Sequence, residues 1–543
     1  MSLQFITGGS GAGKSEYLSR LVCEESVRRP HDNFIVVVPE QYTMETQKKL
    51  VHMHSRKGIL NIDVVSFERL AYKVFEELGG GNRPVLDDTG KNLIVRRVLE
   101  KEKKKLDYFG SSIEKTGFVS ELKSVISELL QYGITPQQLG EIGENVKEKQ
   151  QLSAKLKDIR LVYKEFMAFL STNYITSEEI LDVLCGLVEK SKLIAGSEII
   201  FDGFTGFTPI QYKLMRLLLV YSKGIKISVT IDKKERPTGH EGWNNLFFMS
   251  KEMMNRLIAI CEEEGINVDD TVCVDRDINY RYEGAKDLAY LERNLFRYKG
   301  GVYTGTPENI RIYEGSNPKE ELQYIVSEIL QLTRKEGFRY RDIAVVTADL
   351  ETYGKVAANM MKQNDIPAFL DYKRSVAANP YVEMLCSALE IVEKGYPYDT
   401  MFRYLRTGLT GISRHDIDML ENYCLAVGIR GSRAWHEPWK KKMKRSTYQP
   451  ELETLNALRE QIMAPFLNLE AVLKDKEANV RAYVTAVYEF VTALHSAEQI
   501  KVLSECEPAG NEYEQLYAKV LELFDRIVEL LGEENVSLKE FNR

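Results

Sequence analysis

Eight residues near the start of the chain have the types and spacing needed to bind nucleotide phosphates. They match the pattern G-x-x-x-x-G-K-[ST] and are Gly8, Gly9, Ser10, Gly11, Ala12, Gly13, Lys14 and Ser15. The glycines let the loop wrap so that backbone N–H groups point at phosphate oxygens, and the lysine reaches the β- and γ-phosphates. The Ser15 hydroxyl can bind Mg²⁺, and the helix that follows adds its positive dipole end. We therefore predict that this loop binds ATP with Mg²⁺.

A P-loop enzyme also needs an acidic residue at the end of a neighbouring strand. The candidate is Asp202, which follows the apolar run 199–201 and would hold Mg²⁺ together with Ser15. The next residue is Gly203, whereas helicase-type motors place a glutamate there to orient or deprotonate the attacking water. The alternative is that Asp202 only begins a turn. The sequence thus predicts phosphate binding but, because of Gly203, not efficient hydrolysis. It does not predict adenine specificity either, because helicase-type motors recognise adenine with a glutamine-bearing segment ahead of the P-loop and only seven residues precede Gly8.

The elements that must position these residues alternate between strand and helix. A short apolar strand precedes the loop and a helix follows it, and further strands are predicted at 34–38, 62–65, 198–201 and 225–231. Continuous apolar runs of this kind are typical of parallel strands buried on both faces. Residues 85–190 have an almost wholly helical pattern. We expect one α/β domain built from 1–84 and 191–300, with residues 85–190 as a helical insertion.

A second α/β set is predicted from 301 to 395. Its strands are expected at 310–313 and 343–347, with a helix that Asn317 caps ahead of Pro318. From 396 to 543 the pattern is helical, and no strand returns. We expect this part to be a helical insertion in a second domain that does not close before the chain ends.

Composition restricts the remaining possibilities. The 543 residues are too many for one hydrophobic core. The net charge of −7 does not indicate nucleic-acid binding, although a basic channel can lie on an acidic protein. No apolar stretch approaches the roughly 20 residues that span a bilayer. The seven cysteines are scattered, without a CxxC pair. That pattern indicates reduced thiols in a cytoplasmic protein and argues against a zinc or iron–sulfur site within this chain.

Several longer segments resemble one family, the AddB (RexB) subunit of the bacterial AddAB helicase–nuclease. Beyond the P-loop they are VVVPEQYT at 36–43, VVSFERLAYKVF at 64–75, IIFDGFTGFTP at 199–209, GFRYRDIAVVT at 337–347, LRTGLTGISRHDIDMLENY at 405–423 and GIRGSRAWHEPW at 428–439. The resemblance implies a superfamily-one helicase-like α/β fold with two RecA-like P-loop domains, each carrying a large helical insertion. It also implies that the nuclease domain and the iron–sulfur cysteines of the family lie outside this chain.

The resemblance further implies a function. The family processes DNA double-strand breaks for homologous recombination, as an ATP-dependent helicase and exonuclease in which this subunit pairs with an AddA-type motor subunit. We expect the partners to be DNA ends, single-stranded DNA carrying the Chi hotspot and that motor subunit, with no membrane involved. Because Gly203 replaces the helicase glutamate, we expect this chain alone to have weak or no ATPase activity and no nuclease activity.

In helicases of this kind, the loops after the second and third strands of the first domain face single-stranded DNA. Glutamine and arginine can read base edges, and aromatic rings can stack on bases. The residues predicted to contact DNA are Gln41, Thr43, Phe67, Arg69 and Tyr72, with Phe204 and Phe207 bordering the same groove. The alternative for Phe67 is a place in the core, and the alternative for Arg69 is an ordinary surface position.

Two other functions remain open from the residues alone. A P-loop phosphotransferase would explain Lys14 and Ser15, but not about a hundred inserted helical residues. A non-catalytic scaffold for a motor subunit would explain Gly203. Trp435 and Trp439, which precede Lys440–Lys442, could form an aromatic and basic surface or could be packing residues, and the sequence does not decide between them.

Overall fold

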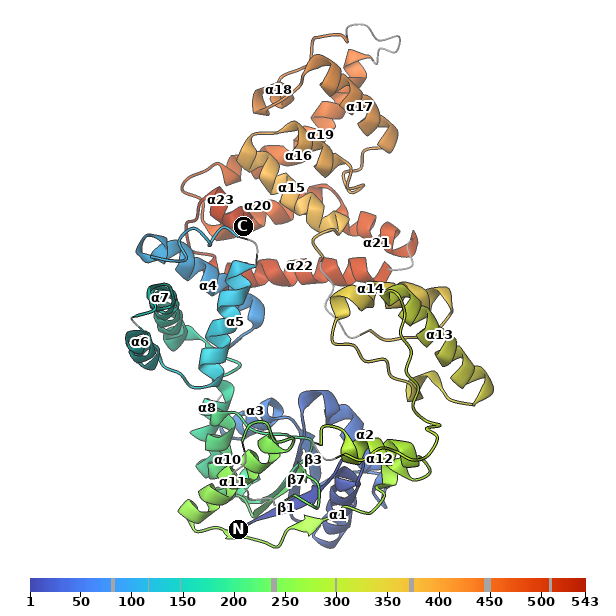
Figure 1. Ribbon diagram of the computed structural model, residues 1–543. Helices are drawn as coiled ribbons and strands as arrows, with labels where there is room; N and C mark the ends of the chain where they lie inside the picture. The colour runs from blue at the N-terminus through green and yellow to red at the C-terminus, as the bar shows by residue number, and fades with distance from the viewer. Residues whose placement is uncertain are drawn as a thin grey trace. The chain divides into compact units, whose positions relative to one another are not determined.

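The computed structural model describes residues 1–79, 84–115, 117–146, 148–235, 242–297, 300–370, 376–443, 451–506 and 510–543. The chain divides into two compact units, residues 1–312 and residues 313–543. Each unit is described by itself (Figure 1). No helix in these ranges is both long enough and apolar enough to cross a membrane.

A parallel sheet forms the centre of the first unit. Its seven strands run in the order β3-β2-β6-β7-β1-β8, and β9 also pairs with β1. Their bounds are β1 Ser2–Gly8, β2 Asn33–Val37, β3 Ile62–Val65, β6 Ser197–Phe201, β7 Gly224–Thr230, β8 Asn267–Val268 and β9 Val272–Cys273. Every pairing is parallel, with Leu3 opposite Ile225 and Val37 opposite both Val65 and Phe201. All carboxyl ends therefore meet at one edge, which is where the P-loop begins.

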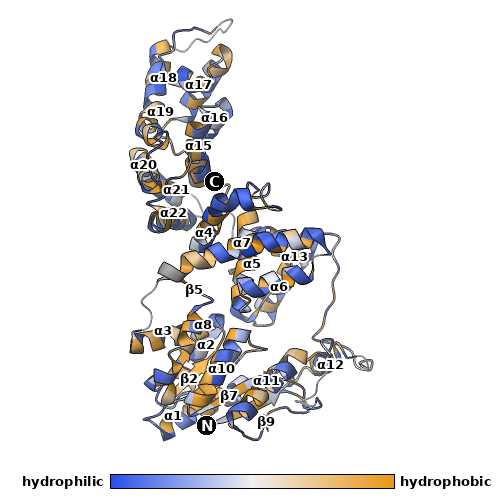
Figure 2. Cartoon of the chain, turned by 90° about the vertical axis from the view of Figure 1, so that its left-hand side faces the viewer, coloured by the Kyte–Doolittle hydropathy of each residue, from blue (hydrophilic) through white to orange (hydrophobic). Residues whose placement is uncertain are grey.

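Helices cover both faces of this sheet, as the continuous apolar runs predict. One face packs Ile6, Val36 and Ile200 against α1 (Lys14–Arg28) and α2 (Thr43–Met53). The opposite face packs Ile35 and Phe201 against α3 (Phe67–Leu78), α10 (Pro209–Tyr221) and α11 (Phe248–Glu264). Figure 2 shows the resulting hydrophobic strands, with β2 and β7 labelled, between more polar helices.

A helical block interrupts this sheet between β3 and β6. Its helices are α4 (Asp88–Glu102), α5 (Phe118–Gln131), α6 (Pro136–Asn145), α7 (Gln150–Asn173), α8 (Ile180–Cys185) and α9 (Lys192–Ala195). A two-stranded ladder of β4 (Val85–Leu86) and β5 (Ile175–Thr176) lies at the base of the block. Buried Asp158 on α7 accepts hydrogen bonds from the backbone N–H groups of residues 107, 108 and 109. This carboxylate ties the turn after α4 to α7.

The second unit begins with two helices but without the expected sheet. Asn317 caps α13 (Pro318–Lys335), as predicted, and α14 spans Leu350–Gln363. The predicted strands at 310–313 and 343–347 are wrong for the residues described here, because neither segment pairs with another strand. Val346 is 92 % exposed. An apolar run becomes a strand only where a neighbouring strand accepts its backbone hydrogen bonds.

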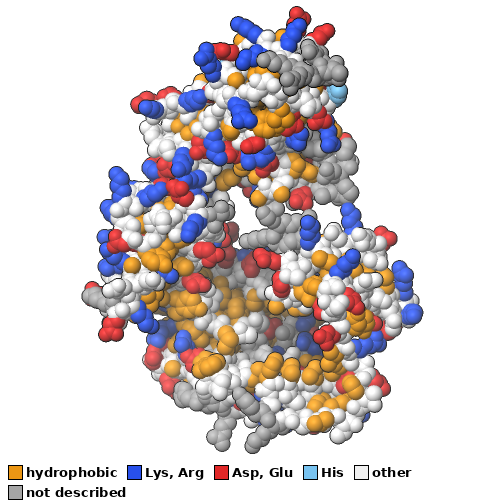
Figure 3. Space-filling model, turned by 45° about the horizontal axis from the view of Figure 1, so that its top comes forward, with side chains coloured by type: hydrophobic (Ala, Val, Ile, Leu, Met, Phe, Trp, Pro, Cys, Tyr) orange, Lys and Arg blue, Asp and Glu red, His pale blue; other side chains and the backbone are white. Residues whose placement is uncertain are grey.

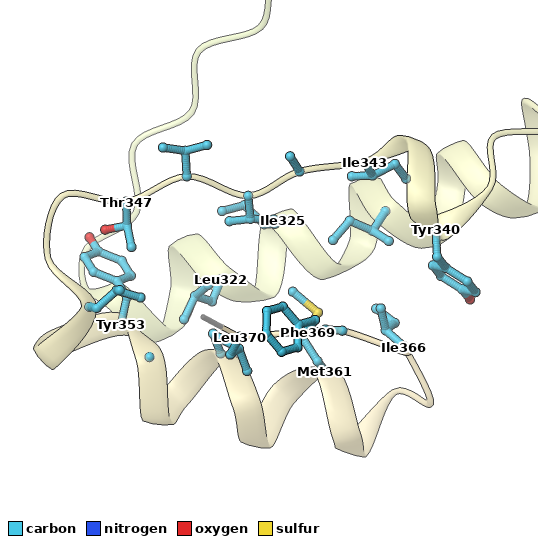
Figure 4. A pocket seen from close by; sticks show the side chains of 18 of the residues that line it. Leu322, Ile325, Tyr340, Ile343, Thr347, Tyr353, Met361, Ile366, Phe369 and Leu370 are labelled. Carbon is cyan, nitrogen blue, oxygen red and sulfur yellow. The ribbon is translucent and has the colours of Figure 1, made fainter. Parts of the chain in front are cut away.

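The unpaired segments 343–348 and 366–370 lie against α13 and α14, and together they line a pocket of about 940 Å³. Figure 4 shows Leu322 and Ile325 from α13 facing Met361 from α14, with Ile343 and Phe369 from the extended segments around them. The lining is predominantly aliphatic and aromatic. Residues 313–370 of the second unit therefore consist of α13, α14 and unpaired segments around them.

The rest of the second unit is helical. It contains α15 (Pro380–Lys394), α16 (Tyr398–Leu405), α17 (Arg414–Val427), α18 (Ser432–His436), α19 (Leu452–Leu473), α20 (Val480–Ala493), α21 (Ser496–Cys506), α22 (Gly510–Leu531) and α23 (Leu538–Asn542). Trp435 and Trp439 are 1 % and 6 % exposed in its core, which makes them packing residues. The Trp439 indole N–H donates to the Ala434 carbonyl. On the face shown in Figure 3, basic and acidic side chains are interspersed with each other and with hydrophobic side chains.

Candidate nucleotide site and the neighbouring sheet edge

The P-loop follows β1 and opens α1 in the geometry that phosphate binding requires. Gly11 and Gly13 have φ values of 71° and 95°, a region that side chains other than glycine rarely adopt. Gly13 caps α1 without any side-chain hydrogen bond. The backbone N–H groups in the first turn of a helix have no partner within the helix. Donors at Lys14 and Ser15 are therefore available to an anion at the positive end of the helix dipole.

Lys14 lies over this loop. Its Nζ donates to the carbonyl oxygens of Gly8 and Gly9, both at 2.9 Å. Burial lowers the pKa of Lys14, and the carboxylates of Asp202 and Asp275 partly oppose that shift. The lysine is thus held at the mouth of the loop by weak neutral acceptors, which a phosphate oxygen can replace with a stronger charge-assisted bond.

The two residues predicted to hold Mg²⁺ follow different strands of the sheet. Ser15 is exposed at the start of α1, which the P-loop joins to β1. Asp202 follows β6, and its Oδ1 accepts a hydrogen bond from the Ser228 hydroxyl at 2.6 Å. Its backbone N–H donates to the Val37 carbonyl. These features suit a nucleotide with its Mg²⁺. The Ser15 hydroxyl is accessible, the Asp202 carboxylate is held in place by a hydrogen bond, and the loop tolerates only glycine at Gly11.

A metal held by protein side chains alone is a separate matter. Among the described residues, no group of three or more histidine, cysteine, aspartate or glutamate side chains could hold a metal ion. A divalent cation at Ser15 and Asp202 would therefore depend on phosphate oxygens and water for its other ligands, which is usual for Mg²⁺.

The structure adds a component that sequence reasoning missed, the segment Asp275–Glu292, called the covering segment here. Asp275 Oδ1 accepts the Gly9 N–H at 2.9 Å, and the Ser10 N–H donates to Glu292. Burial raises the pKa of Glu292, and the nearby acids Asp232 and Asp275 raise it further. More than 260 residues separate Asp275 from Gly9 along the chain. No spacing rule connects residues so far apart; only the pairing of β9 with β1 brings them together.

The loops after β2, β3 and β6 lie side by side along the same edge. The Arg69 guanidinium pairs with Glu40 at 2.9 Å, which joins the loops after β3 and β2. A Cβ on Gly203 would lie 3.4 Å from the Pro39 ring, which brings the loop after β6 against the loop after β2. Gln41 is exposed, and Tyr72 is 40 % exposed. The ion pair places Arg69 beside Glu40, the neighbour of Gln41, and Tyr72 follows Arg69 by three residues on α3, which puts both on the same side of that helix.

Two residues predicted to contact DNA point into the protein instead. Phe67 is 7 % exposed, and its ring lies 5.4 to 6.0 Å from the rings of Phe201, Phe204 and Phe207. Thr43 is 5 % exposed, and its hydroxyl donates to the Glu40 carbonyl in the first turn of α2. Phe204 and Phe207 are half-buried and pack on Phe67. The core alternative is therefore right for Phe67, because Phe67 begins α3 on the side that faces β6.

The chain matches the model of a protein family described as "ADDB, N-terminal" over residues 5–292. That stretch contains the P-loop, the second half of β1, all the other strands of the sheet and the covering segment. It is slightly more than half of the chain.

Curated relatives match over the whole chain. One from Lachnoclostridium phytofermentans, named as the B subunit of an ATP-dependent helicase/deoxyribonuclease, is 41% identical over 553 residues, covering 100% of this chain and 48% of the relative. Proteins of the same name from Clostridium novyi and Caldanaerobacter subterraneus are 33% and 34% identical over 100% of this chain, and 47% and 48% of their own lengths are covered. The chain spans about half the length of the curated relatives it matches.

Proposed function

Because the chain belongs to the AddB family, we propose that it serves as the nucleotide- and DNA-binding part of the B subunit of an ATP-dependent helicase/deoxyribonuclease. In this role it works with an AddA-type motor subunit in processing double-strand breaks for homologous recombination. The observation that carries the proposal is the position of the P-loop on the same sheet edge as Gln41, Arg69 and Tyr72. A nucleotide and an unpaired strand bound at one edge can influence each other through the loops between them.

The nucleotide is ATP or ADP with Mg²⁺, bound at Gly8–Ser15. Lys14 contacts the β- and γ-phosphates, the first-turn N–H groups of α1 hold phosphate oxygens, and Ser15 and Asp202 hold the cation. Bound Mg²⁺ neutralises phosphate charge. Gly203 provides no side chain to orient water, so turnover by this chain alone is expected to be feeble.

The DNA is single-stranded and passes along the edge formed by the loops after β2 and β3. Gln41 and Arg69 offer hydrogen bonds to base edges, and Tyr72 offers an exposed ring. Arg69 is already extended toward solvent by its ion pair with Glu40, and both side chains are more than half exposed. Recognition of the Chi hotspot by this edge is part of the proposal.

ATP turnover by the purified chain, measured with and without single-stranded DNA and with a set of small phosphate acceptors, tests this function. We expect nucleotide binding and a low ATPase rate that rises when single-stranded DNA is added. DNA-independent phosphate transfer to a small acceptor would instead support a phosphotransferase. Absence of both binding and turnover would support a scaffold whose P-loop is a structural remnant.

A further inference from the structure

The second unit carries a concentration of positive charge on residues 430–442, called the basic segment here. Its basic residues, apart from a histidine, are Arg430, Arg433, Lys440, Lys441 and Lys442, and all five are exposed. The segment has a single acidic residue, Glu437, whereas the chain as a whole has a net charge of −7. Figure 1 shows that α18, which belongs to this segment, lies together with α17 and α19 at one end of the second unit.

Buried contacts hold the backbone of the basic segment in place. The Tyr423 hydroxyl on α17 donates to the Lys441 carbonyl at 2.7 Å. The Trp439 backbone N–H donates to the Asn456 side-chain oxygen at 2.7 Å, and the Asn456 amide donates back to the Trp439 carbonyl at 3.0 Å. The exposed lysine side chains therefore extend from a backbone that α17 and α19 fix on the inner side.

The lysines at 440–442 differ from other basic residues of the chain in having no acidic partner. Within the ranges that the structure describes, none of the three forms an ion pair, whereas Arg433 pairs with Glu437 at 2.8 Å. In the helical block of the first unit, Lys105 likewise pairs with Glu102 at 2.6 Å. Exposed positive charges that no carboxylate neutralises are available to an anionic ligand.

The surroundings of these lysines favour duplex DNA as that ligand. Unpaired bases are bound by stacking on exposed aromatic rings. Trp435, Trp439 and Tyr423 are buried, and their rings pack on each other with centroids 5.4 and 5.2 Å apart. The segment thus offers positive charge without a stacking surface. Duplex DNA presents one phosphate charge per about 1.7 Å of its axis, twice the density of one strand, and its bases are already stacked.

We propose that the basic segment binds the phosphate backbone of double-stranded DNA, independently of base sequence. The inference goes beyond the proposed function, which places an unpaired strand on the first unit. Each lysine ammonium contacts a phosphate as a point charge and displaces a cation bound to the DNA. Such contacts position a duplex without reading its sequence.

Binding of the whole chain to a short blunt-ended duplex, followed by fluorescence anisotropy over a range of salt concentrations, tests this proposal. For the triple substitution Lys440→Gln, Lys441→Gln and Lys442→Gln we expect affinity for the duplex to fall about 10- to 100-fold at low salt. The slope of log affinity against log salt concentration should become shallower by about 2 to 3, because each lost phosphate contact removes about 0.9. Duplexes of two unrelated sequences should be affected alike.

A matched control removes the same number of charges elsewhere in the second unit. Lys476, Lys501 and Lys519 are also exposed, and their joint replacement by glutamine should leave the affinity and the salt slope unchanged. An equal loss in this control would show that net charge alone is responsible and would overturn the proposal. Unchanged duplex affinity in the variant at 440–442 would overturn it as well.

A single strand of the same length and a poly-glutamate peptide distinguish the other ligands. We expect the variant at 440–442 to bind the single strand as the wild type does, and neither protein to bind the peptide. Equal loss for single strand and duplex would assign the segment to the strand path, and peptide binding lost in the variant would assign it to an acidic protein. Either result overturns the proposal. Failure of the wild type to bind the single strand, with duplex binding intact, would instead refute the proposed strand edge of the first unit.

Discussion

The P-loop and the loops after β2 and β3 lie on the same edge of one sheet, yet they differ in how their chemistry is built. The P-loop presents backbone donors, and two glycines with positive φ fix its shape. The neighbouring loops rely on side chains. Of the five residues predicted there, Phe67 and Thr43 are turned inward, and Arg69 is paired with Glu40.

This difference has a physical cause. A site made of backbone groups depends on local conformation, which glycine and helix geometry specify within a few residues. A site made of side chains depends on which way each residue faces, and packing with distant elements decides that. Phe67 faces inward because Phe201, Phe204 and Phe207, more than 130 positions away in the chain, surround its ring.

The largest expected effect separates core from surface on α3. Phe67→Ala should lower the free energy of unfolding of the first unit by about 3–5 kcal/mol, because it leaves a cavity among three aromatic rings. Tyr72→Ala, on the exposed side of the same helix, should cost less than about 1 kcal/mol. Urea denaturation gives the difference, and hydrogen exchange of β2, β3 and β6 localises it. A Phe67→Ala protein that is as stable as the wild type but binds DNA less well would show that Phe67 contacts DNA.

Removal of the Lys14 side chain from the P-loop should have the next largest effect. Lys14→Ala should weaken binding of ATP and ADP by about 30- to 100-fold, since charge-assisted hydrogen bonds to phosphate are lost. Calorimetry with Mg²⁺ measures the change. Lys48→Ala removes an exposed lysine on α2 and is the control, with no expected effect. Unchanged affinity in Lys14→Ala would show that the nucleotide does not bind at this loop.

The sequence predicted the parts of the fold that local pattern determines. The P-loop, the strands around it and the cap at Asn317 all depend on residues within one turn or one strand. The Asn317 side-chain oxygen accepts the Glu320 N–H at 3.0 Å, as its position directly ahead of Pro318 predicts.

The predictions that failed concern segments whose structure depends on residues far away in the sequence. The apolar run at 343–347 has the composition of a buried strand, but strand formation requires a neighbour whose backbone completes the ladder. The covering segment was not recognised, because Asp275, Asn279, Arg281 and Glu292 have no motif spacing relative to the P-loop. Only the sheet order brings these residues to it.

A third prediction tests whether the side-chain loops read DNA sequence. The double substitution Gln41→Ala with Arg69→Ala, made in the complete heterodimer, should cost about 1–3 kcal/mol on a preferred sequence and little on others. General DNA degradation and the response to the hotspot are both measured, and we expect selective loss of the hotspot response. Arg20→Ala, which removes an arginine paired with Glu16 on α1, is the control. A full hotspot response would exclude these loops as the reader, and collapse of general degradation would assign them to the strand path.

The smallest expected effect concerns the ion pair that holds Arg69. Glu40→Gln should change the free energy of unfolding by less than about 1 kcal/mol, because both partners are more than half exposed and water screens them. The same substitution frees Arg69 for DNA and removes a negative charge from the proposed strand path. Affinity for single-stranded DNA should therefore rise about two- to threefold at low salt, and the gain should shrink as salt increases. Glu76→Gln, an equal change of charge near the far end of α3, should leave DNA affinity unchanged. A rise of the same size in both variants would mean that net charge alone is responsible, whereas a rise confined to Glu40→Gln would assign Arg69 to the DNA surface.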